Sequence, residues 1–342
     1  MAFSRDLSRS KQESMFNEDY LVSDTAYADV MTKTVLPWLE SRERTWLLPG
    51  YDNDPIFTVS YEAEDPVGTV FLVHGFTENA FKYAEMIYSL LHLHFSVVAY
   101  DHRGHGRSWR KEGIPDPSVT HVDHFFEYVD DMRHVYESYR DRTASPHFVF
   151  AHSMGGAVTA LFLEKYQDAF SAAVLSSPMI APDIGGIPAS VASSIAAVAR
   201  RFGREKNNPF FMKRYSGPES FADSCATDPE RFAWYDHIKS IRTEFHNSVP
   251  SYQWSAESIK VTKRILAPGE PEKIRCPVLL FTADQDHSVL PKPQESFIRR
   301  VPGGKHVFVP GSRHEIFRST NDVLFPWWHQ VISFFTQYSA RS

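Results

Sequence analysis

Short runs of almost continuously apolar residues recur along this chain, and they restrict its fold more than any other feature. They are TVFLV (69–73), FSVVAY (95–100), HFVFA (147–151), AAVLSS (172–177), VLLFTA (278–283) and HVFV (306–309). Strands that are buried on both faces have this composition, and they are typical of parallel sheets. A further segment, FTVSYEA (57–63), alternates apolar and polar residues. It predicts a half-buried strand, antiparallel and near an edge of the sheet.

Helical patterns separate these runs. In FFEYVDDMRHVYESY (125–139), apolar residues recur at spacings of three and four, as they do on one face of a helix. AFKYAEMIYSLLHL (80–93) and GGAVTALFLEKY (155–166) have similar patterns. Alternating strands and helices predict βαβ units with right-handed crossovers. The expected fold class is therefore α/β, with a mostly parallel central sheet flanked by helices.

The alternation is interrupted in the middle of the chain. From 178 to 267 there are amphipathic pieces but no convincing core strand: ASVASSIAAVARRFGREK (189–206) predicts a helix with a basic end, and the aromatic stretch NPFFMKRY (208–215) follows. We interpret 178–267 as a helical cap inserted over the carboxyl edge of the sheet. The expected organisation is a lead-in (1–50), a core formed by 51–177 and 268–342, and this cap, which is compatible with a length of 342 residues.

Composition excludes several classes of function. The net charge of −6 offers no overall basic field for nucleic acid. The two cysteines, Cys225 and Cys276, are too few for a disulfide framework. The first twenty residues are polar and lack the apolar stretch of a secretory signal, and no run approaches about 18 consecutive apolar residues. A cytoplasmic protein is expected, with at most peripheral contact with a membrane.

One serine stands where a nucleophile would be expected. Ser153 follows the buried run 147–151 and precedes the helical pattern 155–166, between the small residues Ala151, Gly155 and Gly156. A sharp strand-to-helix turn holds a nucleophile in a strained backbone conformation and leaves space only for small neighbours, which is the basis of the G-x-S-x-G elbow. Here the first glycine position is Ala151. We expect Ser153 to be a catalytic nucleophile.

A serine nucleophile needs a base, and the base needs an orienting acid. In this kind of fold the acid and then the histidine follow the last strands of the sheet. DQDHSV after the run 278–283 offers Asp284 and Asp286, and PGSRHE after the run 306–309 offers His314. His314 is the expected base, and the residues alone leave both aspartates open.

An oxyanion intermediate needs two backbone donors. One expected donor is the N–H of Met154, directly after the nucleophile. The other should come from HGFTEN (74–79), after the first buried run, where the N–H of Phe76 is the candidate.

Two other polar motifs fit structural roles better than chemical ones. DHRGHGRS (101–108) lacks the spacing of a phosphate-binding loop. We expect it to pack beneath the site, with Arg103 paired to Asp130 or Asp131. HVDH (121–124) has no further ligands at zinc-site spacing, so neither a metal nor a cofactor is expected.

With these residues, the sequence resembles the α/β-hydrolase superfamily, in particular its lysophospholipase L2 and monoacylglycerol lipase group. The matching stretches are KYAEMIYSLLHLHFSVVAYDHRGHGRS, HVDHFFEYVDDM, AHSMGGAVTALFLEKY, SSPM, PSYQWSAESI and PGSRHEIF. The resemblance implies hydrolysis of a carboxylic ester in a single-chain lipid, with Ser153 as nucleophile and His314 as base. It favours Asp286 over Asp284 as the acid, and it places an oxyanion donor at Phe76.

The leading hypothesis is therefore a lysophospholipase, with a monoacylglycerol lipase or another carboxylesterase as alternatives. Basic residues at the end of the cap helix would meet a phosphate or an anionic bilayer: Arg200, Arg201, Arg204 and Lys206. A second hypothesis is a proline-type aminopeptidase, which needs an acidic cluster in the cap; the candidates are Glu219, Asp223, Asp228 and Glu230. A third is a catalytically dead scaffold.

Overall fold

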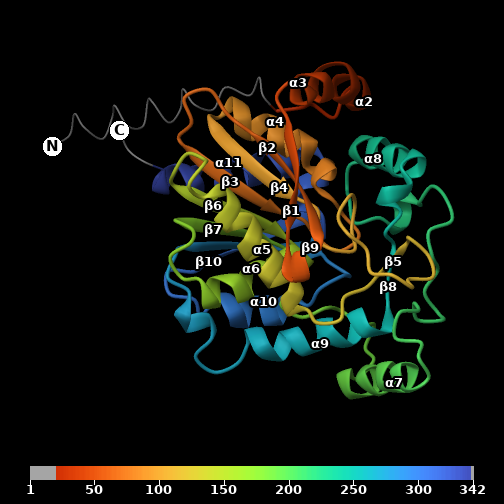
Figure 1. Ribbon diagram of the computed structural model, residues 1–342. Coiled ribbons are helices and arrows are strands. Elements are labelled where there is room, and N and C mark those ends of the chain that lie inside the picture. Colours follow the sequence, from red (N-terminus) through yellow and green to blue (C-terminus); the bar gives the residue numbers. More distant parts are fainter. Residues whose placement is uncertain (1–20, 340–342) are drawn as a thin grey trace.

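A single eight-stranded sheet organises the protein in the computed structural model, which describes residues 21–339 (Figure 1). Its strands are β1 (Arg44–Pro49), β2 (Pro55–Tyr61), β3 (Gly68–Val73), β4 (Phe95–Tyr100), β6 (His147–His152), β7 (Ala172–Ser176), β9 (Val278–Gln285) and β10 (Lys305–Arg313). Their spatial order is β1-β2-β4-β3-β6-β7-β9-β10. The pairs β1–β2 and β2–β4 are antiparallel, and every other neighbouring pair is parallel. The predicted parallel sheet, with β2 antiparallel near one edge, is confirmed.

Helices cover both faces of the sheet and bury two separate apolar cores. One face is covered by α2 (Tyr27–Val30), the π-helical turn η2 (Met31–Val35), α3 (Leu36–Glu40), η4 (Ala80–Tyr83), α4 (Ala84–His92) and α11 (Asn321–Tyr338). The other is covered by α5 (Phe126–Tyr139), α6 (Met154–Lys165) and α10 (Pro291–Ile298). Short 3-10 turns are η3 (Tyr51–Asn53), η7 (Pro271–Lys273) and η8 (Ile316–Arg318).

The chain between β7 and β9, which we call the β7–β9 segment, adds no strand to this sheet. It contains α7 (Ala189–Arg201), η5 (Phe221–Asp223), α8 (Pro229–Ile241), η6 (Thr243–Phe245), β8 (Val249–Pro250) and α9 (Tyr252–Ile265). In Figure 1 its helices lie at the right and along the bottom of the sheet. The short strand β8 pairs with β5 (Val119–Thr120), so the segment is tied to the loop that follows β4.

The helix expected at 189–206 is shorter than the sequence pattern indicated. α7 ends at Arg201, and Gly203 then adopts a left-handed conformation with φ of 65°. The N–H of Arg204 turns back to the carbonyl of Ala199 at 2.8 Å, which closes the end of the helix. The basic residues after Gly203 therefore lie beyond the helix.

Strand β1 was not anticipated, and it falls inside the expected lead-in. Trp46 and Leu47 are 59% and 64% exposed, so the strand has no alternation of buried and exposed residues to reveal it. Residues 1–20 of the expected lead-in lie outside the described part of the chain. Among the helices within residues 21–339, none has the length and apolar character needed to span a bilayer.

Candidate active site

Ser153 lies in the sharp turn between β6 and α6, with φ of 50° and ψ of −118°. A positive φ is rare for a residue with a side chain, and such strain is characteristic of functional turns. Two hydrogen bonds hold the turn: the N–H of Ser153 donates to the carbonyl of Ser176 (3.1 Å), and the N–H of Met179 donates to the carbonyl of Ser153 (2.8 Å). The nucleophile candidate is thus fixed to the end of the neighbouring strand β7.

The small residues around Ser153 are required by close backbone packing. A Cβ added to Gly155 would collide with the carbonyl oxygens of Val73 and His74. A Cβ on Gly156 would lie 2.5 Å from the Cβ of Pro178. The turn can therefore form only where the second and third residues of α6 have no side chain.

His314 and Asp286 complete a hydrogen-bonded series with Ser153. The Nε2 atom of His314 lies 2.8 Å from Ser153 Oγ, and its Nδ1 atom lies 2.7 Å from Asp286 Oδ2. All three side chains are nearly buried. Asp284 is exposed and instead accepts a hydrogen bond from the N–H of Gly311 at 3.1 Å. Of the two aspartates left open by the sequence, Asp286 is the one that contacts the histidine.

The second oxygen of Asp286 is held by the backbone. Its Oδ1 accepts hydrogen bonds from the N–H groups of Ser288 (2.8 Å) and Val289 (3.1 Å). Burial alone would raise the pKa of Asp286, but the hydrogen bond and charge of His314, together with these N–H groups, lower it overall. Asp286 is therefore an ionised acceptor with one fixed orientation.

The loop after β3 lies directly against Ser153. A Cβ on Gly75 would be 3.0 Å from Ser153 Cβ, so the backbone of the next residue, Phe76, borders the serine. Met154 is the first residue of α6, where a backbone N–H has no partner within its own helix. These are the two expected oxyanion donors, and the N-terminal end of α6 adds a favourable dipole for negative charge.

Behind this loop lies a buried ionic cluster that the sequence patterns did not reveal. Glu78 accepts hydrogen bonds from the N–H of Gly75 (2.7 Å) and the hydroxyl of Tyr83 (2.6 Å). Lys82 bridges Glu78 at 2.9 Å and Glu315, the residue after His314, at 2.6 Å. The loop after β3 and the loop that carries His314 are thus joined by one ammonium group.

This cluster and its neighbours have shifted pKa values. Burial would raise the pKa of Glu78, but the charges of Lys82 and His152 lower it to about 2. Burial lowers the pKa of His152 to about 4, although Glu78 opposes the change, so the imidazole is neutral near pH 7. The ring of His152 packs against that of His314 in a tilted arrangement, with the ring centroids 4.7 Å apart. His314 therefore has a neutral aromatic neighbour.

Ser153 and His314 open into a largely apolar cavity of about 580 Å³. This volume is within the range of small-molecule sites. The β7–β9 segment supplies most of the lining, with side chains that include Ile184, Ile187, Ile195, Phe211, Met212, Trp254 and Ile259. The ring of Trp254 in α9 also packs against that of Phe76, with ring centroids 4.2 Å apart. The cavity can hold a chain of methylene groups beside the serine.

The remaining sequence candidates lie away from the reacting groups. Arg103 forms a buried two-point ion pair with Asp131, at 2.6 and 2.8 Å, so Asp131 rather than Asp130 is its partner. His121 of the HVDH motif contacts Ser251 Oγ at 2.9 Å and Asp123 at 3.1 Å. No group of three or more His, Cys, Asp or Glu side chains suited to a metal occurs within residues 21–339.

The four acidic cap candidates do not gather at the cavity. Asp228 is buried and caps α8 by accepting the N–H of Arg231 at 2.7 Å. Glu219 pairs with Lys239 at 2.6 Å. Asp223 and Glu230 are exposed. None of the four is among the described residues that line the cavity.

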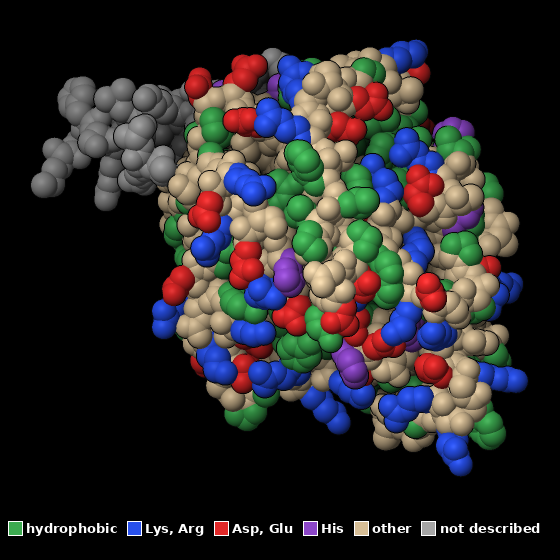
Figure 2. All heavy atoms as spheres, in the orientation of Figure 1, with side chains coloured by type: hydrophobic (Ala, Val, Ile, Leu, Met, Phe, Trp, Pro, Cys, Tyr) green, Lys and Arg blue, Asp and Glu red, His purple; other side chains and the backbone are tan. Residues whose placement is uncertain are grey.

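The basic candidates lie on the outer surface of the β7–β9 segment. Arg200, Arg201 and Arg204 are exposed, and Lys206 donates to the carbonyl of Glu112 at 2.8 Å. Figure 2 shows Lys and Arg side chains gathered along the lower edge of the molecule, over α9 and α7.

Comparison with known proteins agrees with this geometry. A model of the family described as serine aminopeptidase, S33, matches residues 64–321, which include every strand from β3 to β10. The chain belongs to this family. Lysophospholipase L2 of Escherichia coli is 28% identical to this hydrolase over 311 residues, which cover 86% of this chain and 87% of the relative. Monoacylglycerol lipase of Mycolicibacterium smegmatis is 28% identical over 268 residues, 76% and 85% of the two chains.

Solved structures have the same fold. A soluble variant of monoglyceride lipase from Saccharomyces cerevisiae, in complex with a substrate analogue, superposes on this hydrolase with a TM-score of 0.67. The two are 19% identical, and the match covers 87% of this chain and 96% of that one. A carboxyl esterase from Bacillus coagulans gives a TM-score of 0.69 at 20% identity, covering 87% and 99%. The predicted α/β-hydrolase fold and the predicted serine hydrolase class are confirmed.

Proposed function

We propose that this hydrolase cleaves the carboxylic ester of single-acyl lipids, with lysophospholipids as its preferred substrates. The observation that carries the proposal is the hydrogen-bonded series Asp286–His314–Ser153 opening into an apolar cavity of about 580 Å³. An acyl chain fits such a lining, while its ester carbonyl lies beside the serine. The similarity to lysophospholipase L2 and to monoacylglycerol lipase supports a lipid ester as the substrate.

The proposed reaction has two stages. His314 Nε2 takes the proton of Ser153 as Oγ attacks the acyl carbonyl, and the N–H groups of Phe76 and Met154 bind the resulting oxyanion. Each such donor typically lowers the barrier by about 3 kcal/mol. His314 then gives its proton to the departing glycerol oxygen, leaving an acyl-serine. Water, deprotonated by His314, cleaves this ester and regenerates Ser153. Asp286 holds the imidazole and stabilises its positive charge.

Monoacylglycerols are the second candidate substrates, because the cavity is largely apolar. No Lys or Arg is among the described residues that line it. A phosphate group would therefore have to be bound outside the cavity. Comparing kcat/KM for monoacylglycerol, lysophosphatidylcholine and lysophosphatidylglycerol of one chain length decides between the candidates. A monoacylglycerol preference above about tenfold would overturn the choice of lysophospholipids.

An aminopeptidase activity is disfavoured, because none of the four acidic candidates is among the described residues that line the cavity. Of the carboxylates that do line it, Glu78 and Glu315 are both paired with Lys82. Proline p-nitroanilide should be turned over far more slowly than lysophosphatidylcholine. A fluorophosphonate probe tests the scaffold alternative. Failure of the folded protein to react at Ser153 would reject the enzymatic proposal.

We also propose that the β7–β9 segment forms the cap and meets an anionic membrane. Its outer surface exposes Val198 (58%), Phe202 (75%), Phe210 (87%) and Phe211 (58%) beside the arginines of α7. Phe211 lines the cavity as well, so the apolar surface reaches the site. Binding to vesicles containing phosphatidylglycerol should weaken with salt and with Phe202→Ser and Phe210→Ser. Equal binding by wild type and the double variant would reject this surface.

A further inference from the structure

We propose that the N-terminal segment 21–40 is a positioning element for the active site, acting through the buried side chain of Arg231. The inference rests on the proposed function, because it concerns how the groups around Ser153 are held. This segment precedes the region matched by the family, which begins at residue 64. Nothing in the family match therefore accounts for its contacts.

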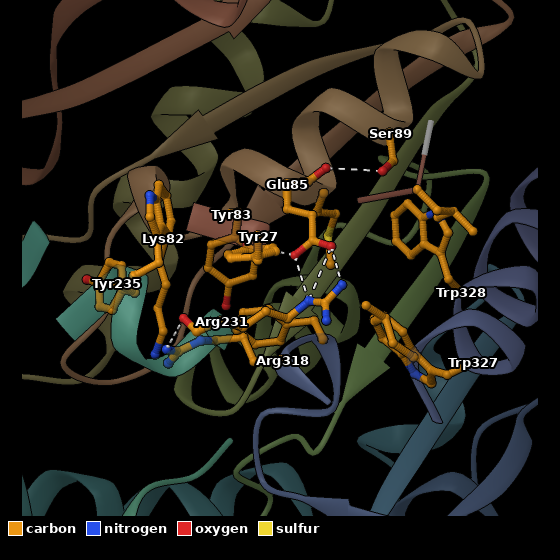
Figure 3. A pocket seen from close by; sticks show the side chains of 15 residues that line it. Tyr27, Lys82, Tyr83, Glu85, Ser89, Arg231, Tyr235, Arg318, Trp327 and Trp328 are labelled. Carbon is orange, nitrogen blue, oxygen red and sulfur yellow. Dashed lines mark hydrogen bonds and ion pairs between the residues drawn. The ribbon is translucent and has the colours of Figure 1, made fainter. Parts of the chain in front are cut away.

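Arg231 of α8 is the point at which three parts of the chain meet. It is only 1% exposed. Its guanidinium donates to Glu85 of α4 through Nε (3.0 Å) and NH2 (2.8 Å), and NH2 also donates to the carbonyl of Val22 at 2.7 Å. The guanidinium lies over the ring of Tyr27, 4.9 Å from its centroid, while the Tyr27 hydroxyl donates to Glu85 at 2.9 Å (Figure 3). The N-terminal segment thus completes the surroundings of this arginine.

From Arg231 the contacts continue to the active site through buried groups. Arg318 donates from NH2 to the backbone carbonyl of Arg231 (2.8 Å) and from NH1 to Glu315 (2.6 Å). Glu315 is the residue after His314, and its other oxygen accepts from Lys82 at 2.6 Å. Figure 3 shows Lys82 and Arg318 extending toward the same point beside Tyr235. The path therefore ends at the loop that carries His314 and, through Lys82 and Glu78, at the loop that carries Phe76.

These ion pairs and hydrogen bonds are better suited to orienting the groups around the active site than to attaching segment 21–40 to the protein. An apolar contact alone, such as the edge packing of Tyr27 on Trp234 with centroids 5.9 Å apart, would attach the segment. Buried ion pairs add little net stability over apolar side chains of the same volume, but they impose fixed distances and directions. Arg231 is buried and its guanidinium is bonded to Glu85 and to Val22, so we expect a change in its position to be passed on to the groups it contacts. Catalytic groups need placement within about 0.5 Å, so even a small displacement that reaches them should slow the reaction.

Two conservative variants test the inference, with a matched control. Tyr27→Phe keeps the ring over Arg231 and removes only the hydroxyl bonded to Glu85. Arg231→Lys keeps the charge but cannot bind Glu85 and Val22 together. Tyr139→Phe is the control, because it also removes a buried hydroxyl, one that lies 3.0 Å from Thr58 Oγ1 and away from the site. We expect Arg231→Lys to slow fluorophosphonate labelling of Ser153 and kcat by about tenfold, Tyr27→Phe by about threefold, and KM to change less than twofold.

Hydrogen exchange supplies a readout that a merely structural role would not change. The N–H of Gly75 is bonded to Glu78, so its protection reports the order of the loop after β3. Faster exchange in 74–79 for Tyr27→Phe, with no change for Tyr139→Phe, supports the inference. Wild-type labelling rates in both Tyr27→Phe and Arg231→Lys, with exchange altered only in 21–40 and 229–241, overturn it. If the wild type itself does not label, the proposed function fails instead, so the two failures are distinguishable.

Discussion

Replacing Asp286 by asparagine tests the proposed mechanism most directly, because the backbone determines how the new side chain must lie. The carboxylate oxygen Oδ1 accepts from the N–H groups of Ser288 and Val289, while Oδ2 accepts from His314 Nδ1. In Asp286→Asn only one oxygen remains, and it is needed by the two N–H groups. The amide NH2 then faces His314 Nδ1, which must become an acceptor.

That change fixes the histidine in the unproductive tautomer. The proton moves to Nε2, which would then donate to Ser153 Oγ, 2.8 Å away, and can no longer take the serine proton. We expect kcat to fall by about ten-thousandfold, a barrier increase of about 5 kcal/mol. The thermal midpoint should change little, because the amide conserves the shape of the carboxyl group and both backbone contacts.

The assay is hydrolysis of a p-nitrophenyl ester and of lysophosphatidylcholine at pH 7, with folding checked by circular dichroism. Asp284→Asn is the matched control: it loses at most the hydrogen bond from Gly311 and should keep kcat within about threefold of wild type. Greater damage from Asp284→Asn than from Asp286→Asn, or more than a tenth of wild-type kcat in Asp286→Asn, would refute the reasoning.

Four other outcomes follow from the contacts described above. Ser153→Ala and His314→Ala should each lower kcat by about a millionfold, because the groups act as a unit; steady-state and single-turnover rates test this. Gly155→Val should destabilise the fold by about 3 kcal/mol or more, seen in urea unfolding, because its Cβ meets backbone carbonyls that cannot move away. Asp131→Asn should cost about 3 kcal/mol in the same assay, since Arg103 keeps its buried charge but loses its two-point partner. The free energy of unfolding should also depend on acid. Burial lowers the pKa of His152 from 6.5 to about 4, so between these pH values the unfolded chain binds more protons than the folded protein. The resulting contribution to the free energy of unfolding, about 3 kcal/mol, is present above pH 6.5 and is lost as the pH falls toward 4. A stability that is constant from pH 7 to 4 in both wild type and His152→Gln would contradict it.

The sheet and the serine turn could be predicted because their signals are local. A buried parallel strand is apolar throughout, and a cramped turn admits only small residues beside Ser153. The choice between Asp284 and Asp286 had no local signal, since both follow the same strand. It depends on where the N–H groups of Ser288 and Val289 point, which the residue types do not encode.

Ionic contacts between residues far apart in the chain could not be predicted from the sequence either. Lys82 and Glu315 are 233 residues apart, and neither belongs to a periodic pattern. Their signal was only a lysine four residues after Glu78 and a glutamate adjacent to His314, features that occur commonly on exposed surfaces. Strand β1 could not be predicted for a different reason. Its side chains are mostly exposed, so apolar and polar residues do not alternate along it.

The β7–β9 segment leaves the sheet after Ser176, three residues before Met179, whose N–H donates to the carbonyl of Ser153. It rejoins the sheet at β9, which is followed directly by Asp286. Both attachments belong to the frame that fixes the reacting groups, and between them α8 contacts the same frame, because the carbonyl of Arg231 accepts a hydrogen bond from Arg318. Substitutions among the residues of α7 that line the cavity can therefore change the preferred substrate while the groups that transfer the proton keep their positions.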